Sequence, residues 1–219
     1  MTHLRRFTRL LPRFLAWLTL AAMLANTGAQ AQTPSAPVLL VVGDSISAGY
    51  GLSKGQVWVD LLTQKLAAEG YKYRVVNASI SGDTTAGGRA RLPALLSQHK
   101  PAIVIVELGG NDALRGGKLA TSRDNLDAMV TAAQAAGAKV LVVGMEIPPN
   151  YGPAYAREFR EMYSGVSTAR KVPLVPAFFA GFGDDLALFQ SDRIHPTADA
   201  QARLLANVWP TLVPLLRSR

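Results

Sequence analysis

Five short runs rich in β-branched residues alternate along this chain with longer amphipathic stretches, and this alternation is what most constrains the fold. The runs cover residues 38–42, 73–77, 103–107, 139–143 and 172–175. Their near-continuous apolar character is typical of strands buried on both faces of a parallel sheet. The stretches between them predict helices over about 57–69, 85–98, 118–136, 153–170 and 197–217. The pattern predicts a doubly wound, three-layer α/β/α domain around a central, mainly parallel five-stranded sheet.

Residues 1–31 differ from the rest of the chain and have the pattern of a secretory signal peptide. Four arginines precede an apolar run at residues 14–24, and small residues follow, ending in Ala29-Gln30-Ala31. We therefore expect cleavage after Ala31, a short linker over 32–37, a single domain over 38–219, and a periplasmic or secreted location. The apolar run is short for a bilayer span. A retained N-terminal anchor is the alternative.

Charge and composition narrow the choice of partners. The full chain has a net charge of +8, and removal of the four leader arginines leaves 19 basic and 15 acidic residues. This mild, spread-out excess argues against nucleic acid and at most favours transient contact with an anionic membrane surface. The chain has no cysteine, and only His99 and His195 lie beyond the leader. A conventional zinc ligand set is therefore missing, so we expect no metal site.

Polar turns punctuated by glycine follow the first three predicted strands. They cover residues 43–47, 77–83 and 108–112, and a fourth polar segment, 191–196, precedes the last helix. In an open α/β sheet, ligands bind at the carboxyl ends of the strands. The four segments are therefore expected to converge on one edge of the sheet.

Ser45, His195 and Asp192 are the candidates for nucleophilic catalysis. A serine after a strand is commonly just a helix N-cap, but a catalytic role is favoured when a base is available. His195 follows Asp192 by three residues, so the carboxylate can fix the imidazole tautomer while the other ring nitrogen accepts the serine proton. The alternative is that Asp192 caps a turn and His195 is an ordinary surface histidine. His99 is predicted at the opposite, amino edge of the sheet, in a structural role.

Acyl transfer also requires hydrogen-bond donors for an oxyanion. Gly82 offers a backbone N–H that substrate can approach closely, Asn111 offers a side-chain amide, and the N–H of Ser45 is the third candidate. Taken singly, the glycine reads as a turn residue and Asn111 as a helix cap. Their shared position after successive strands favours the oxyanion interpretation.

Together these segments resemble the SGNH, or GDSL-like, hydrolases. The matching blocks are Gly43-Asp44-Ser45-Ile46-Ser47, Gly82, Gly109-Gly110-Asn111-Asp112 and Asp192-Arg193-Ile194-His195-Pro196. Within that family the chain is most similar to the periplasmic group of acyl-CoA thioesterases, lysophospholipases and arylesterases. Three stretches carry this closer similarity, residues 43–52, residues 109–116 and Pro148-Pro149-Asn150-Tyr151-Gly152.

The resemblance implies a flavodoxin-like fold, with Ser45, Asp192 and His195 as the triad and Ser45, Gly82 and Asn111 as the oxyanion hole. It also implies hydrolysis of aryl esters, acyl thioesters and lysophospholipids without a cofactor, by what we expect to be a monomer. The candidate substrate-binding residues are Asp44, Ile46, Leu114, Ile147, Pro148 and Tyr151, with Phe178 and Phe179 as further apolar candidates. The apolar members of this set are equally typical of a protein core.

Two other functions remain open at this point. One is a carbohydrate O-acetyl esterase on the same scaffold, which would prefer acetyl over longer acyl esters. The other is a periplasmic binding module without catalysis, which would be indicated by a missing triad member. Nucleotide binding is disfavoured, because neither G-x-G-x-x-G nor a Gly-Lys-Ser/Thr loop follows the first strand.

Overall fold

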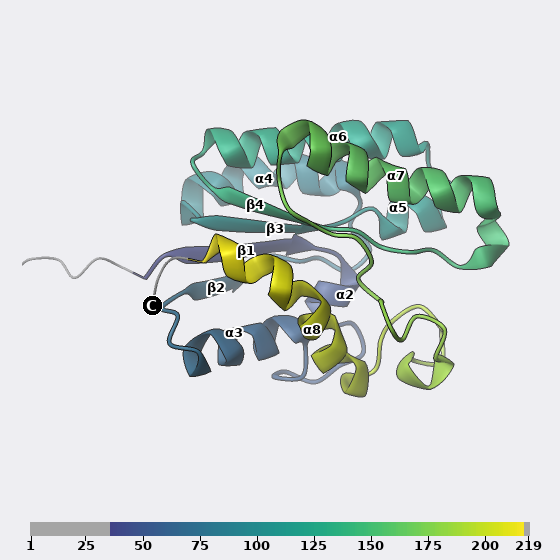
Figure 1. Ribbon diagram of the computed structural model, residues 1–219, viewed down its shortest axis with the longest axis horizontal. Helices are drawn as coiled ribbons and strands as arrows, with labels where there is room; N and C mark the ends of the chain where they lie inside the picture. Colours follow the sequence, from purple (N-terminus) through teal and green to yellow (C-terminus); the bar gives the residue numbers. More distant parts are fainter. Residues whose placement is uncertain (1–35, 217–219) are drawn as a thin grey trace, which may run out of the picture. The chain divides into compact units, whose positions relative to one another are not determined.

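A computed structural model describes residues 36–216, which contain a five-stranded sheet between two layers of helices (Figure 1). The strands are β1 (Val38–Gly43), β2 (Arg74–Asn77), β3 (Ile103–Glu107), β4 (Lys139–Val143) and β5 (Leu174–Val175). The predicted signal peptide over residues 1–31 lies outside the described residues. No helix within residues 36–216 has the length and apolar character needed to cross a membrane.

The sheet has the strand order β2-β1-β3-β4-β5, and every neighbouring pair is parallel. This confirms the predicted three-layer, flavodoxin-like architecture, with an entirely parallel sheet where a mainly parallel one was expected. All residues of β1 and β3 are buried, whereas the edge strand β2 is only partly covered. The central position of β1 and β3 explains why their sequences are apolar on both faces.

Helices cover both faces of the sheet. The longer ones are α3 (Trp58–Ala68), α4 (Thr85–His99), α6 (Leu119–Ala135), α7 (Pro153–Arg170) and α8 (Gln201–Leu212). The α4, α6 and α7 helices pack side by side on one face, and α3 packs with α8 on the other (Figure 1). The connection from β1 to β2 passes over the face covered by α3, and the connections from β2 to β5 pass over the face covered by α4, α6 and α7. The strand order therefore reverses between β1 and β3.

Short helical segments complete the described chain. They are α2 (Ser45–Ala48), α5 (Gly110–Leu114), η1 (Pro149–Tyr151), η2 (Leu186–Leu188), η3 (Ala198–Ala200) and η4 (Val213–Leu215). The segments that form α2 and α5 are predicted as turns, because four or five residues carry no helical periodicity.

The last predicted helix and the last predicted strand differ from the structure. The helix expected over 197–217 is divided into η3, α8 and η4. Pro214, which has no N–H to continue the α-helical hydrogen bonds, lies in η4 just after α8 ends. The strand expected over 172–175 is shortened to Leu174–Val175. Pro173 again lacks the N–H that a strand residue donates to its neighbour.

The two helical layers are fixed by buried side chains, and one pair of leucines allows this to be measured. Leu62 on α3 is fully buried, whereas Leu186 is 56% exposed. Leu62→Ala is expected to lower the free energy of unfolding by about 2 to 5 kcal/mol, because it removes apolar contacts and leaves a cavity. Leu186→Ala should change it by no more than about 0.5 kcal/mol. Urea denaturation followed by circular dichroism measures both, and equal losses would contradict this account of the core.

Candidate active site

The predicted nucleophile lies in a tight turn at the carboxyl end of β1. Ser45 opens α2, and the preceding Asp44 caps that helix by accepting a hydrogen bond from the Ile46 amide at 3.0 Å. Gly43 has no room for a side chain, because a Cβ there would lie 2.4 Å from the Glu107 carboxylate on the neighbouring strand. This close packing holds the turn that carries Ser45 against β3.

His195 and Asp192 reach this turn from the loop before α8. The His195 Nε2 atom lies 2.8 Å from Ser45 Oγ, and His195 Nδ1 lies 2.7 Å from Asp192 Oδ2. The other oxygen of Asp192 accepts hydrogen bonds from the amides of Ile194 and His195, at 2.9 and 3.0 Å. The structure therefore brings the three predicted residues together in one hydrogen-bonded relay.

The loop that carries His195 is fixed by its own backbone. The Gln190 amide donates to the His195 carbonyl at 2.8 Å, and the Gln190 side chain donates to the Tyr50 carbonyl at 2.8 Å. Arg193, between Asp192 and His195, has a φ of +59°, a left-handed conformation that a non-glycine residue adopts only when its surroundings enforce it. The Tyr50 ring lies against the imidazole, with centroids 4.5 Å apart and the two planes tilted by 37°.

Asp192 is held in its ionised form. Partial burial raises its pKa, but the hydrogen bonds from the His195 amide and ring, and then the one from the Ile194 amide, lower it further, so the net pKa falls from 3.8 to about 2. An ionised carboxylate at Nδ1 orients the ring so that Nε2 faces Ser45.

The candidate oxyanion donors lie on the neighbouring turns. Asn111, in α5 after β3, donates from Nδ2 to the Asp83 carbonyl at 2.9 Å and to Asp44 Oδ2 at 3.1 Å. Gly82 precedes Asp83 and has a φ of +79°, which glycine adopts without strain. Asn111 lines the cavity beside Ser45, whereas Gly82 is not among the described residues that line it.

Asp44 and Glu107 form a pair of buried carboxyl groups beneath Ser45, and the sequence did not predict the Glu107 member. Glu107, the last residue of β3, is fully buried and accepts hydrogen bonds from Ser47 Oγ at 2.5 Å and from the Asp44 amide at 3.3 Å. The Trp58 indole donates to the same Ser47 hydroxyl at 3.1 Å. Glu107 reads in sequence as the end of a strand, and only the β1–β3 pairing places it under the nucleophile.

Burial also changes the proton affinity of this pair. It raises the pKa of Asp44 to about 6, against the hydrogen bond from the Ile46 amide, which lowers it. Burial, followed by the nearby charge of Asp44, raises the pKa of Glu107 well above its usual range. The Asp44 and Glu107 pair therefore retains a proton up to a higher pH than exposed carboxyl groups do.

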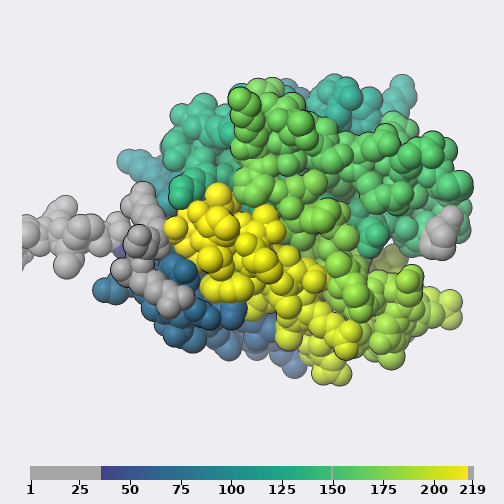
Figure 2. All heavy atoms as spheres, viewed as in Figure 1, coloured from purple at the N-terminus to yellow at the C-terminus, as the bar shows by residue number. Residues whose placement is uncertain are grey.

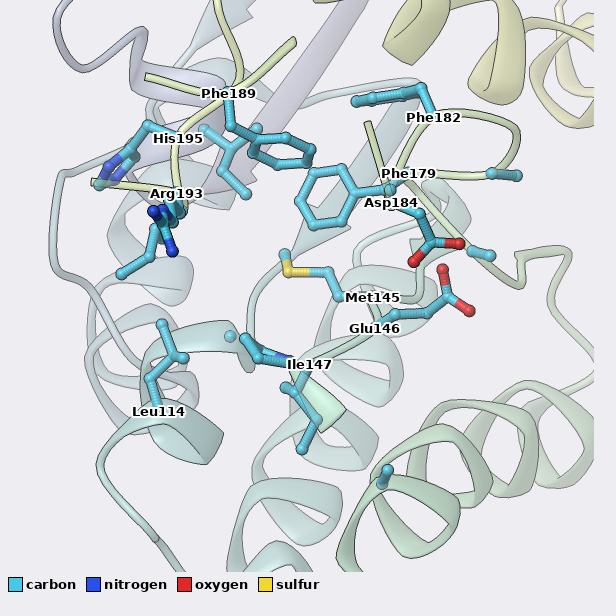
Figure 3. A pocket seen from close by; sticks show the side chains of 18 of the residues that line it. Leu114, Met145, Glu146, Ile147, Phe179, Phe182, Asp184, Phe189, Arg193 and His195 are labelled. Atoms are coloured by element: carbon cyan, nitrogen blue, oxygen red, sulfur yellow. The ribbon is translucent and has the colours of Figure 1, made fainter. Parts of the chain in front are cut away.

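A cavity of about 1680 Å³ opens beside Ser45 and His195. Figure 2 shows it as a hollow between the green N-terminal part of α7 and the yellow-green loop of residues 180–190. In Figure 3, His195 lies at one end and the carboxylates of Glu146 and Asp184 lie at the other. The side chains between them are apolar, with the rings of Phe179 and Phe189 adjacent and the Met145 thioether beside them (Figure 3).

Most of the predicted substrate-binding residues line this cavity. They are Asp44, Ile46, Leu114, Ile147, Pro148 and Phe179. Tyr151 lies differently, since its hydroxyl donates to the Leu114 carbonyl at 2.8 Å and its ring stacks with Tyr155. The prediction that Phe178 contacts the substrate was wrong, because its side chain is fully buried and packs edge-to-face on Trp58.

Several cavity residues were missed by the sequence analysis. Met145, Phe182, Phe189 and Ile194 line the cavity but lie in loops, where single apolar residues have no periodic pattern. His99 is the last residue of α4 and leads into the amino end of β3, away from this cavity, as predicted. Within residues 36–216 there is no cluster of three His, Asp or Glu side chains suited to a metal ion.

The ionised state of Asp192 should be visible in the pH dependence of stability. Its pKa is lower in the folded protein than in the unfolded chain, so folding favours the charged form, fully so above the unfolded pKa near 3.8. This contribution is lost as the pH falls toward about 2. Asp192→Asn lacks it, so the difference in unfolding free energy between wild type and variant should shrink across that interval. Urea titrations at pH 6, 4 and 2.5 test this, and a pH-independent difference would contradict it.

Comparisons with known proteins assign the chain to a family. The chain is 57% identical over 197 residues to the esterase TesA of Pseudomonas aeruginosa, covering 90% of this chain and 96% of the relative. It is 40% identical over 203 residues to thioesterase 1/protease 1/lysophospholipase L1 of Escherichia coli, covering 93% and 91%. A crystal structure of TesA superposes with a TM-score of 0.81 at 59% identity, covering 82% of this chain and 99% of that one. Residues 41–203 match the family profile, and the chain thus belongs to the GDSL-like lipase/acylhydrolase family.

Proposed function

We propose that this protein is a serine hydrolase of carboxylic esters and thioesters, with Ser45 as nucleophile, His195 as general base and Asp192 as the residue that orients the imidazole. The observation that carries the proposal is the pair of contacts of 2.8 and 2.7 Å that join Ser45, His195 and Asp192 across 150 residues of sequence. Such a relay, in the wall of a cavity, is the arrangement that activates a serine hydroxyl.

The reaction proceeds through an acyl-enzyme. His195 Nε2 accepts the Ser45 proton as Oγ attacks the acyl carbon, and the carbonyl electron pair moves to the oxygen. The tetrahedral intermediate collapses, and the imidazolium protonates the departing alcohol or thiol. Water then attacks the acyl-serine by the same route, and the carboxylic acid leaves with Ser45 regenerated. The reaction requires water and no metal or cofactor.

The oxyanion is bound by the amides of Ser45 and Gly82 and by the Asn111 side chain in this proposal. Asn111 Nδ2 donates its two hydrogens to the Asp83 carbonyl and to Asp44 Oδ2, so the bond to the oxyanion replaces the longer one, to Asp44. The bond to Asp83 keeps the amide in place during this exchange, and a donor placed beside the reacting carbonyl stabilises the transition state more than the substrate.

The cavity favours acyl groups longer than acetyl. Its volume is about 1680 Å³ and its middle section is lined by Met145, Phe179 and Phe189, which give an alkyl chain apolar surface to bury. The thioesterase 1/protease 1/lysophospholipase L1 of Escherichia coli adds, by its name, thioesters and lysophospholipids as substrate classes. Aryl esters suit the same site, because Tyr50 is 53% exposed beside His195 and offers a ring for an aromatic leaving group.

Partners and location form the remaining part of the proposal. We infer a monomer that acts on small or lipid-like acyl substrates, binds no nucleic acid and contacts membrane surfaces transiently. The leader pattern of residues 1–31 supports export to the periplasm or beyond.

Replacement of the nucleophile tests the proposal directly. Ser45→Ala is expected to abolish turnover of p-nitrophenyl esters, because no hydroxyl remains to form the acyl-enzyme. The control is Ser97→Ala, an exposed serine on α4, which should retain wild-type activity. Esters from acetyl to palmitoyl are compared, and a preference for medium chains is expected. A preference for acetyl would favour the O-acetyl esterase, and an inactive wild type would favour the binding module.

The oxyanion role of Asn111 has its own test. Asn111→Ala is expected to lower kcat by about 100- to 1000-fold, the scale measured for removal of one oxyanion donor. KM should change little, because the donor acts mainly on the transition state. Steady-state kinetics on the ester with the highest wild-type rate measure both, and turnover within a few-fold of wild type would remove Asn111 from this role.

A further inference from the structure

We propose that Arg91 on α4 is a positioning residue that keeps the nucleophile and the oxyanion donors in register. The proposal rests on the function proposed above. Arg91 lies outside the Ser45–His195–Asp192 relay and is not among the described residues that line the cavity. Its effect on catalysis would therefore pass entirely through the groups that it holds.

The Arg91 guanidinium contacts three separate acceptors behind the active site. Its Nε donates to Asp83 Oδ2 at 2.8 Å, its Nη2 donates to the Gly43 carbonyl at 3.3 Å, and its Nη1 donates to the Ala78 carbonyl. The side chains of Arg91 and Asp83 are only 20% and 11% exposed. An ion pair this sheltered from water is not free to exchange partners as a surface pair does.

Two of these acceptors, Gly43 and Asp83, adjoin groups that the reaction needs. The Gly43 carbonyl lies immediately before the turn of Asp44 and Ser45, and it also accepts the Ile80 amide at 3.0 Å. Asp83 follows Gly82, and its carbonyl accepts from Asn111 Nδ2 at 2.9 Å. Arg91 thus joins the ends of β1 and β2 directly and reaches the turn after β3 through Asp83.

The charge of Arg91 matters as well as its geometry. Burial is the main reason why the pKa of Asp44 is raised, and the negative charge of Asp83 raises it further. Without the guanidinium, the Asp83 carboxylate would be an uncompensated negative charge close to the Ser45 turn, which disfavours a second negative charge nearby. The positioning by Arg91 and its compensation of the Asp83 charge both act on the transition state more than on the bound ester.

A lysine cannot reproduce this arrangement. The planar guanidinium presents five N–H donors in fixed directions and reaches Asp83, Gly43 and Ala78 at once, whereas an ammonium is a compact point charge. Arg91→Lys therefore separates charge from geometry, and Arg91→Met removes both while keeping much of the apolar stem.

Arg170 offers a matched control elsewhere in the molecule. Its guanidinium forms a two-point ion pair with Asp127, and this pair links α7 to α6 rather than the strand ends. Arg170→Met removes the same chemical group from a purely structural pair. It is expected to affect stability and leave kcat unchanged.

The experiment measures kcat, KM and the affinity of an alkylboronic acid for wild type, Arg91→Lys, Arg91→Met and Arg170→Met. The boronic acid adds to Ser45 as a tetrahedral anion and so reports the oxyanion site. For Arg91→Met we expect kcat and boronic-acid affinity to fall together by about 10- to 100-fold, less than loss of a donor itself. KM should stay within a few-fold, and Arg91→Lys should lie between Arg91→Met and wild type.

Each outcome decides the question. Boronic-acid affinity equal to wild type in Arg91→Met, or kcat losses matched by Arg170→Met, would overturn the positioning role. If Arg91→Met does not fold, Arg91→Lys carries the test, and a wild-type kcat for that variant would count against the proposal. If wild type and Ser45→Ala hydrolyse the ester at the same rate, the proposed function itself is rejected. Active wild type with unaffected Arg91 variants rejects the positioning role alone.

Discussion

The parallel pairing of β1 with β3 is the constraint on which the rest of the site depends. These strands are neighbours in the sheet although β2 separates them in sequence, and Gly43 stands opposite Glu107 in their register. The strand order reverses here, so the turns that follow β1 and β3 open onto the same cleft. Ser45 and Asn111 face one cavity for this reason. A shift of one residue would turn every side chain of β1 to the opposite face.

The same pairing creates an electrostatic conflict beneath the nucleophile. Two carboxyl groups, Asp44 and Glu107, are brought together out of water, and burial raises the pKa of both. The Ser47 hydroxyl donates to Glu107 and accepts a hydrogen bond from the Trp58 indole, while Asp83 nearby is paired with Arg91. Catalytic sites commonly concentrate such unfavourable interactions, because the groups are placed for chemistry rather than for stability.

The strands, the long helices and the polar turns could be predicted from the sequence, because each leaves a periodic or compositional pattern. Ser45, Asp192 and His195 followed from where such turns must meet in a parallel sheet. The buried role of Glu107 and the contacts of Arg91 could not be predicted, since both residues look ordinary in their own segments. Met145 and Phe189 were missed because isolated apolar residues in loops have no pattern, and Phe178 was misassigned for the same reason.

The relay is assembled from opposite ends of the chain. Ser45 and the candidate oxyanion donors lie within residues 45–111, whereas Asp192 and His195 come from the loop that precedes α8. A polypeptide is made from its N-terminus, so a partly synthesised chain can form the nucleophile turn long before any base reaches it. Such an intermediate would hold an unactivated serine. Hydrolytic activity therefore requires that the whole domain has folded, and an incomplete chain lacks the base needed to attack acyl groups.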